Sequence, residues 1–297
     1  MTHRAILLFW IALFVRGPAD AAPLTAIDDA GRSVTIDRPP TRIMALTPGH
    51  TEILFALGAE DRIVAVDQWS DFPQAAKAKP RIAPLNPNLE QVVRFNPDLI
   101  LSTRGGAEPL LPLERYGIKV MIFAPQTLDD LYRNILLIGR IVDAEVRAEG
   151  VVRTMRQRVA AVVAKVRDAP RPKLFIELDG SDPDRPFTAG PGSFIDILVQ
   201  LAGGVNVAAH SRMAWPQFSL EELVKADPDL IILADPLSPT NPHAVELAAR
   251  RRGWSRLRAV RLGAIAAIDL SPISRPGPRI VEGLELLAGL LHPDRFR

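Results

Sequence analysis

Apolar residues recur with helical spacing through a long stretch in the middle of the chain, from 143 to 168. The positions that would share one face of a helix are Val146, Val151, Val152, Met155, Val159, Val162, Val163 and Val166. Asp143 is the expected N-cap, and no proline interrupts the pattern before Pro170. A helix of this length measures about 36 Å, which is as long as a small domain is wide. We expect it to connect two lobes; a surface helix of a single domain is the alternative interpretation.

Short apolar strands alternate with amphipathic helices on both sides of this connecting helix. After an expected β-hairpin, the strands predicted in the first half lie at 42–46, 62–66, 98–102 and 120–123. Those predicted in the second half lie at 173–177, 230–233 and 264–269. Strand–helix alternation with short links is typical of parallel sheets. We therefore predict an α/β fold of two similar lobes with parallel sheets joined by one long α-helix, with boundaries at 22–142, 143–168 and 169–297.

One stretch of the first lobe is repeated in the second. Residues 88–100 read NLEQVVRFNPDLI, and residues 219–231 read SLEELVKADPDLI. Each copy predicts a helix followed directly by a strand, at equivalent places in the two halves. Two similar lobes on a helical connection leave a cleft between them, which is a favoured place for a ligand.

The start of each repeated helix carries a capping signal. Ser219 and Glu222 have the spacing of a capping box. In the first copy, Asn88 and Gln91 have the same spacing and form its near analogue. The residues just before these capping partners, Glu90 and Glu221, are then free to project from the surface. The alternative is that both glutamates merely favour the positive end of the helix dipole.

Composition and charge narrow the classes of function. The chain is 47% hydrophobic and 24% charged, its net charge is only +2, and no basic run marks a nucleic-acid surface. The chain has no cysteine. Disulfides, thiolate nucleophiles, cysteine-ligated metal centres and a lipid anchor on cysteine are therefore excluded.

The first 21 residues read as a secretory signal peptide. Arg4 supplies the positive charge, Ala5–Val15 is an apolar run, and Ala19–Ala21 offers small residues for cleavage. This run is too short to span a bilayer as a helix, so a membrane anchor is the weaker alternative. We expect a soluble, secreted protein of the periplasm that starts near Ala22.

Motifs of catalysis and metal binding are missing. The histidines have no metal-ligand spacing, and neither H-E-x-x-H, G-x-S-x-G nor a P-loop occurs. The glycine turn at 190–193 is a weak candidate for an anion site at a helix N-terminus. We expect no catalytic residue, no resident metal and no resident cofactor. An extracytoplasmic enzyme that uses acidic side chains near Gly190 is the alternative.

Aromatic side chains fall in connecting loops of both halves. Trp69 and Phe72 follow a strand of the first half, and Phe187 and Trp215 lie in loops of the second. Any one of them could simply cover its own loop. Together, aromatics in facing loops suit a large, flat ligand that buries apolar area on binding.

Several motifs together resemble the helical-backbone class of periplasmic binding proteins, which serve ABC importers of vitamin B12, siderophores and haem. In the first half they are Thr51-Glu52 within 42–58, WSDFP at 69–73, NLE at 88–90, NPDL at 96–99 and YGIKV at 116–120. In the second half, FTAG at 187–190, SRMAWPQ at 211–217 and GPR at 277–279 resemble the vitamin B12-binding members most. The resemblance covers about residues 40–290.

The resemblance implies a monomeric protein that carries a metal chelate and catalyses nothing. The expected cargo is a cobalamin-type corrinoid, transported rather than kept as a cofactor. Trp69, Phe187 and Trp215 are then expected to pack on the ligand. Arg104 and Arg275 would donate hydrogen bonds to its amides or phosphate. Haem or a ferric siderophore is the alternative cargo, with His50 or His210 as an iron ligand.

The resemblance also implies a partner, the ABC permease of the inner membrane. In this class one glutamate on each lobe docks to arginines of the permease. The matching positions here are Glu90 and Glu221, with Glu52 as the alternative to Glu90.

Overall fold

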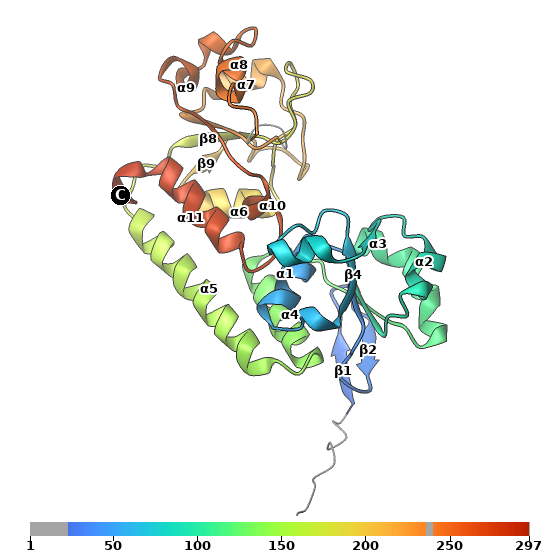
Figure 1. Cartoon of the computed structure of the whole chain (residues 1–297). Helices are drawn as coiled ribbons and strands as arrows, with labels where there is room; N and C mark the ends of the chain where they lie inside the picture. The colour runs from blue at the N-terminus through green and yellow to red at the C-terminus, as the bar shows by residue number, and fades with distance from the viewer. Residues whose placement is uncertain (1–22, 236–239, 297) are drawn as a thin grey trace, which may run out of the picture.

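The structure is a computed structural model that describes residues 23–235 and 240–296, so the expected signal peptide lies outside the described residues. The chain forms two lobes, and helix α5, Glu145–Val166, runs along one side of both (Figure 1). In the described part of the chain, no helix is both long enough and apolar enough to cross a membrane.

The first lobe is built on a five-stranded parallel sheet with the order β5-β4-β3-β6-β7. Its strands are β3 Ile43–Ala45, β4 Ile63–Asp67, β5 Arg81–Ile82, β6 Leu99–Ser102 and β7 Lys119–Ile122. Its helices are α1 Pro48–Ala56, α2 Leu89–Arg94, α3 Arg104–Ala107 and α4 Leu128–Ile141. The predicted hairpin is confirmed as the antiparallel pair β1 Leu24–Ile27 and β2 Ser33–Ile36.

The second lobe has a four-stranded parallel sheet with the order β11-β10-β8-β9. Its strands are β8 Lys173–Glu177, β9 Val205–Asn206, β10 Leu230–Leu233 and β11 Ile265–Ala267. Its helices are α6 Phe194–Leu201, α7 Leu220–Ala226, α8 Ala244–Ala249, α9 Arg258–Arg261, α10 Ser271–Ser274 and α11 Ile280–Leu291. The predicted α/β architecture with parallel sheets in two lobes is therefore confirmed. The short strands β5 and β9 carry too few residues for a recognisable pattern.

The connecting helix begins later than its sequence suggests. Asp143 is not its N-cap, because this residue has a left-handed backbone (φ 57°) between α4 and α5. The N-cap is Ala144, which makes no side-chain capping bond. The chain reverses tightly here: a Cβ on Gly139 would lie 2.4 Å from the Cβ of Ala148. Close packing of α4 on α5 therefore decides where the helix starts.

The buried face of α5 differs from the expected one at its first turn. Val146 is 84% exposed, whereas Ala148 is fully buried against α4. Further along, the pattern is correct, since the buried positions include Val152, Met155, Val162 and Val166. The early turn faces a helix that approaches closely, so the smaller side chain is the one that fits.

The repeated sequence folds into the same element in each lobe, namely α2–β6 and α7–β10. Both helices are followed by a residue with left-handed backbone, Asn96 (φ 44°) and Asp227 (φ 43°). The carboxylate of Asp98 then accepts a hydrogen bond of 3.0 Å from the backbone N–H that leads into β3. Asp229 accepts one of 2.9 Å from the first N–H of β8. The aspartates thus fix the start of a neighbouring strand in each lobe.

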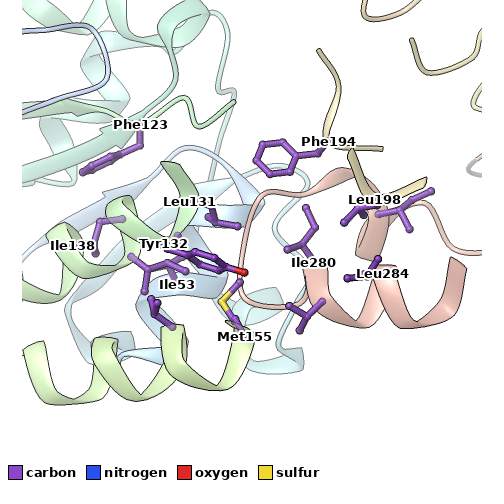
Figure 2. Packing of buried hydrophobic residues seen from close by; sticks show 14 of the residues in the cluster. Ile53, Phe123, Leu131, Tyr132, Ile138, Met155, Phe194, Leu198, Ile280 and Leu284 are labelled. Atoms are coloured by element: carbon purple, nitrogen blue, oxygen red, sulfur yellow. The ribbon is translucent and has the colours of Figure 1, made fainter. Parts of the chain in front are cut away.

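The apolar core continues from one lobe into the other (Figure 2). Side chains of α1, α4 and α5 belong to the same cluster as side chains of α6 and α11, among them Ile53, Leu131, Tyr132, Ile138, Met155, Phe194, Leu198, Ile280 and Leu284. Buried apolar contact is the largest favourable contribution to folding. The lobes are therefore held together by a shared core as well as by the connecting helix.

Candidate ligand-binding site

The loop after β4 presents two aromatic side chains to solvent. Trp69 is 50% exposed and Phe72 is 41% exposed. The loop is anchored beneath them by buried Asp67, whose carboxylate accepts hydrogen bonds from the N–H of Trp69 (2.8 Å) and the hydroxyl of Ser70. Burial raises the pKa of Asp67, although these two hydrogen bonds oppose the shift. Ligands of open parallel sheets bind beyond the carboxyl ends of the strands, where this loop lies.

The second lobe presents two more aromatics on paired extended segments. Phe187 lies opposite Gln217 in an antiparallel bridge, and the N–H of Thr188 donates to the carbonyl of Pro216 (3.0 Å). Side chains alternate between the faces of such a pair, so Phe187 and Trp215 share one face. They are 40% and 51% exposed, whereas Thr188 and Pro216 on the other face are buried. The segment containing Phe187 follows the carboxyl end of β8.

The glycine turn at 190–193 has a structural role. A Cβ on Gly190 would lie 2.3 Å from the carbonyl oxygen of Met213, so only glycine permits this approach of the two segments. Ser193 is the N-cap of α6 and accepts from the N–H of Asp196 (3.2 Å). Asp196 is buried and accepts from the amide of Asn206 (2.8 Å). The acidic side chain next to this turn, Asp196, is therefore buried and makes hydrogen bonds within the fold.

Charged side chains join the loops of the two lobes. Arg275 of the second lobe donates to Asp71 of the first, two residues beyond Trp69. Arg279 donates to Glu52 in α1 (2.7 Å), and its guanidinium lies 3.7 Å from the ring centroid of Phe72. We call these five residues, Glu52, Asp71, Phe72, Arg275 and Arg279, the interlobe cluster.

The backbone around the interlobe cluster is also closely packed. A Cβ on Gly49 would lie 2.2 Å from the carbonyl oxygen of Pro276, and one on Gly277 would lie 3.3 Å from Glu52. The side chain of Glu52 is only 3% exposed, which excludes it as an accessible docking group. Burial raises the pKa of Glu52, and the hydrogen bond and charge of Arg279 oppose that shift. The segment 276–279 of the second lobe therefore packs directly against the N-terminal half of α1.

Arg104 lies apart from the interlobe cluster. It is the first residue of α3, at the carboxyl end of β6, and its side chain is exposed. Its guanidinium donates to the backbone carbonyl of Asp29 in the hairpin turn. Among the described residues, no hydrogen bond or ion pair links Arg104 to Trp69 or Arg275. The structure thus brings Trp69 and Arg275 to one loop region. Arg104 lies at the end of β6, which is separated from β4 by β3.

Glu90 and Glu221 occupy the first turns of α2 and α7, and both are exposed. Neither makes a hydrogen bond or ion pair within the described residues. Figure 1 shows α2 and α7 in different lobes and well apart from each other. Their first turns are therefore two widely separated acidic points.

The capping prediction is confirmed for α7 and half wrong for α2. Ser219 and Glu222 form a complete capping box. In α2, Asn88 accepts from the backbone N–H of Gln91 (3.1 Å), but the Gln91 side chain donates to the carbonyl of Arg81 (3.4 Å). The edge strand β5 provides an acceptor within reach of this amide, so the reciprocal bond to the N-cap is not made.

The two candidate iron ligands lie in different surroundings. His50 is 4% exposed and packs against Phe123, with ring centroids 5.8 Å apart. Burial lowers the pKa of His50 to about 4, so its imidazole is neutral at physiological pH. His210 is exposed and lines a hollow of about 560 Å³ beside β9 and α7. No group of three or more potential metal ligands occurs in the described parts of the chain.

Two α/β lobes, with exposed aromatics on loops beyond their strand ends, define a two-lobed ligand-binding protein. Residues 43–271 match the family profile described as periplasmic binding protein. The chain belongs to this family.

Similar proteins include one named for its transport system and one named for its ligand. An uncharacterized ABC transporter substrate-binding lipoprotein of Bacillus subtilis is 31% identical over 283 residues, which are 93% of this chain and 87% of the relative. A cobalamin-binding protein of Halobacterium salinarum is 30% identical over 280 residues, covering 91% of this chain and 74% of the relative.

Solved structures of similar proteins agree with the fold. The crystal structure of the periplasmic vitamin B12 binding protein of Vibrio cholerae has a TM-score of 0.74 and 27% identity, and the match covers 87% of this chain and 99% of that one. A periplasmic heme-binding protein from a Roseiflexus species has a TM-score of 0.76 and 25% identity, covering 86% and 99%. The helical-backbone class expected from the sequence motifs is therefore confirmed.

Proposed function

We propose that this protein is the substrate-binding component of an ABC importer and that it captures a cobalamin-type corrinoid between its lobes. The observation that carries the proposal is the set of exposed aromatics on loops that extend from both lobes. The interlobe cluster joins the first of these loops to the second lobe. The cobalamin-binding relative and the vitamin B12 binding structure support the choice of cargo.

A corrinoid offers broad apolar faces and a polar rim, and the candidate residues suit both. Trp69, Phe187 and Trp215 are each about half exposed, so they have apolar area left to bury on a ligand. Arg275 supplies a guanidinium donor for amide oxygens at the rim, and Arg104 supplies one for amide or phosphate oxygens. The corrinoid is cargo rather than cofactor, and binding needs no catalytic residue.

The proposed partner is the inner-membrane permease, reached from the periplasm by a monomer after export. Glu90 and Glu221 are the proposed docking residues, one on each lobe. Both are exposed in the first turns of their helices and have no ionic partner in the described chain, so their charges are available to arginines. Complementary charges at such an interface set register and encounter rate.

Replacing Trp215 with alanine is expected to weaken corrinoid binding by about 1–3 kcal/mol, because one large buried aromatic contact is lost. Isothermal calorimetry with cobalamin measures the change. Tyr116→Ala is the matched control, since Tyr116 is an exposed aromatic (69%) at the end of the segment before β7. Unchanged affinity in Trp215→Ala, with unchanged circular dichroism, would remove Trp215 from the site.

The second candidate cargo is haem or another iron chelate, favoured by the heme-binding structural neighbour. Calorimetry against cobalamin, cobinamide, haem and ferric siderophores separates the candidates. The absorption spectrum of the purified protein gives an independent answer, since a corrinoid colours it pink to red and haem adds a Soret band. Binding of haem alone would replace the corrinoid assignment and leave the transport function in place.

The shared core and the connecting helix predict little lobe movement. We expect the radius of gyration from small-angle X-ray scattering to be nearly the same with and without cobalamin. Wide closure requires hinge segments that absorb large backbone changes, and the two lobes here meet through buried side chains. A contraction of several ångströms on binding would show that these contacts separate.

A further inference from the structure

The two ion pairs of the interlobe cluster differ in how far their side chains are exposed to solvent. In the pair between Arg279 and Glu52, the side chains are 14% and 3% exposed. In the pair between Arg275 and Asp71, they are 17% and 51% exposed. Asp71 is therefore the member that a ligand can touch, and it lies next to Phe72 and two residues from Trp69.

Asp71 remains ionised at neutral pH. Partial burial raises the pKa of this carboxyl, but the hydrogen bond and charge of Arg275 outweigh burial and leave the pKa below its ordinary value. The carboxylate of Asp71 thus balances the charge of Arg275, and Glu52 is the acidic partner of Arg279. Each arginine of the cluster therefore has an acid of the first lobe as its partner.

The more exposed pair, Asp71 and Arg275, favours a ligand whose peripheral groups are neutral amides. An amide group carries both a donor and an acceptor, so it can donate to the Asp71 carboxylate and accept from the Arg275 guanidinium. A carboxylate offers acceptors only. A carboxylate of the ligand would either have to displace Asp71 from Arg275 or lie beside the negative charge of Asp71. Like charges at short distance repel each other.

We infer that Asp71 makes the site selective for a chelate rimmed by neutral amides over the same chelate rimmed by carboxylates. The inference rests on the proposed corrinoid function and deepens it, because it names the residue that decides the class of peripheral group. Asp71 acts here both by direct contact and by balancing the charge of Arg275.

The test compares two corrinoids with the same ring, cobinamide with its amides and cobyrinic acid with its carboxylates. Calorimetry or absorbance titration gives the ratio of their affinities. We expect the unmodified protein to prefer cobinamide by about tenfold or more. Asp71→Asn should reduce this ratio at least about tenfold, chiefly by improving the binding of cobyrinic acid. Asp61→Asn, at another exposed acid of the first lobe, should leave the ratio unchanged.

Salt provides a second measurement on the unmodified protein, which does not depend on the folding of a variant. Preference caused by charge repulsion at a partly exposed site should fall as ionic strength rises. An unchanged ratio in folded Asp71→Asn, or a ratio indifferent to salt, would overturn the selectivity assignment while cobinamide binding still supports the proposed function. Failure of the unmodified protein to bind either corrinoid would overturn the proposed function itself.

Discussion

Replacing both Glu90 and Glu221 with alanine is expected to nearly abolish uptake of the ligand while leaving its binding intact. Each single replacement should lower uptake in part. The reason is geometric: the two glutamates project from equivalent first turns in different lobes, and the shared core fixes the lobes relative to each other. Two carboxylates at a fixed separation can engage two arginine clusters of a permease simultaneously, and charge pairs matter more once the interface excludes water.

The measurement is uptake of the labelled ligand in cells that carry the cognate permease, beside calorimetry on the purified variants. Glu145→Ala is a suitable control, because Glu145 is also an exposed glutamate in the first turn of a helix, α5. Full uptake by the double variant would defeat the docking assignment. Loss of ligand affinity would instead place these residues in the binding site.

Replacing Arg279 with alanine is expected to destabilise the protein by about 3–5 kcal/mol. Removal of one member of a buried ion pair leaves the other charge without compensation. Here that charge would be Glu52, which is 3% exposed on the far side of the lobe boundary. The guanidinium also loses its position over Phe72 (3.7 Å). Urea unfolding monitored by circular dichroism gives the free energy of unfolding.

The ion pair between Arg158 of α5 and Glu285 of α11 provides a matched control. Arg158 pairs with Glu285 at 2.6 Å, but these side chains are 36% and 39% exposed. Arg158→Ala should therefore cost only about 0–1 kcal/mol. The double variant Glu52→Gln with Arg279→Met should be less destabilised than Arg279→Ala, since no unpaired buried charge remains. A cost below about 1 kcal/mol for Arg279→Ala would show that the pair does not hold the lobes.

Features that depend on neighbouring residues could be predicted from the sequence. Thr47 before Pro48 is a local signal for the start of α1, and the Thr47 hydroxyl accepts a hydrogen bond from the N–H of His50 (3.2 Å). The repeated frame indicated equivalent helices with exposed glutamates, and both helices form. The loop aromatics Trp69, Phe187 and Trp215 were also recognised as candidates, and the structure leaves each of them about half exposed. These signals are local: helix periods, caps and turns are decided within a few residues.

Contacts between the lobes were decided only by the tertiary structure. The sequence motif at 277–279 was recognised, but its arginine pairs with a glutamate 227 positions away, and Arg275 pairs with an acid 204 positions away. No rule of sequence spacing links such residues. Their distance in space depends on how the two sheets and the helices α1 and α11 pack around one core. The same reason explains the start of α5, where the close approach of Gly139 buries Ala148 and leaves Val146 in solvent. Local sequence patterns therefore predicted the elements, the repeat and the candidate surfaces. Packing across the lobe boundary determined which charges are buried and which remain available to a ligand.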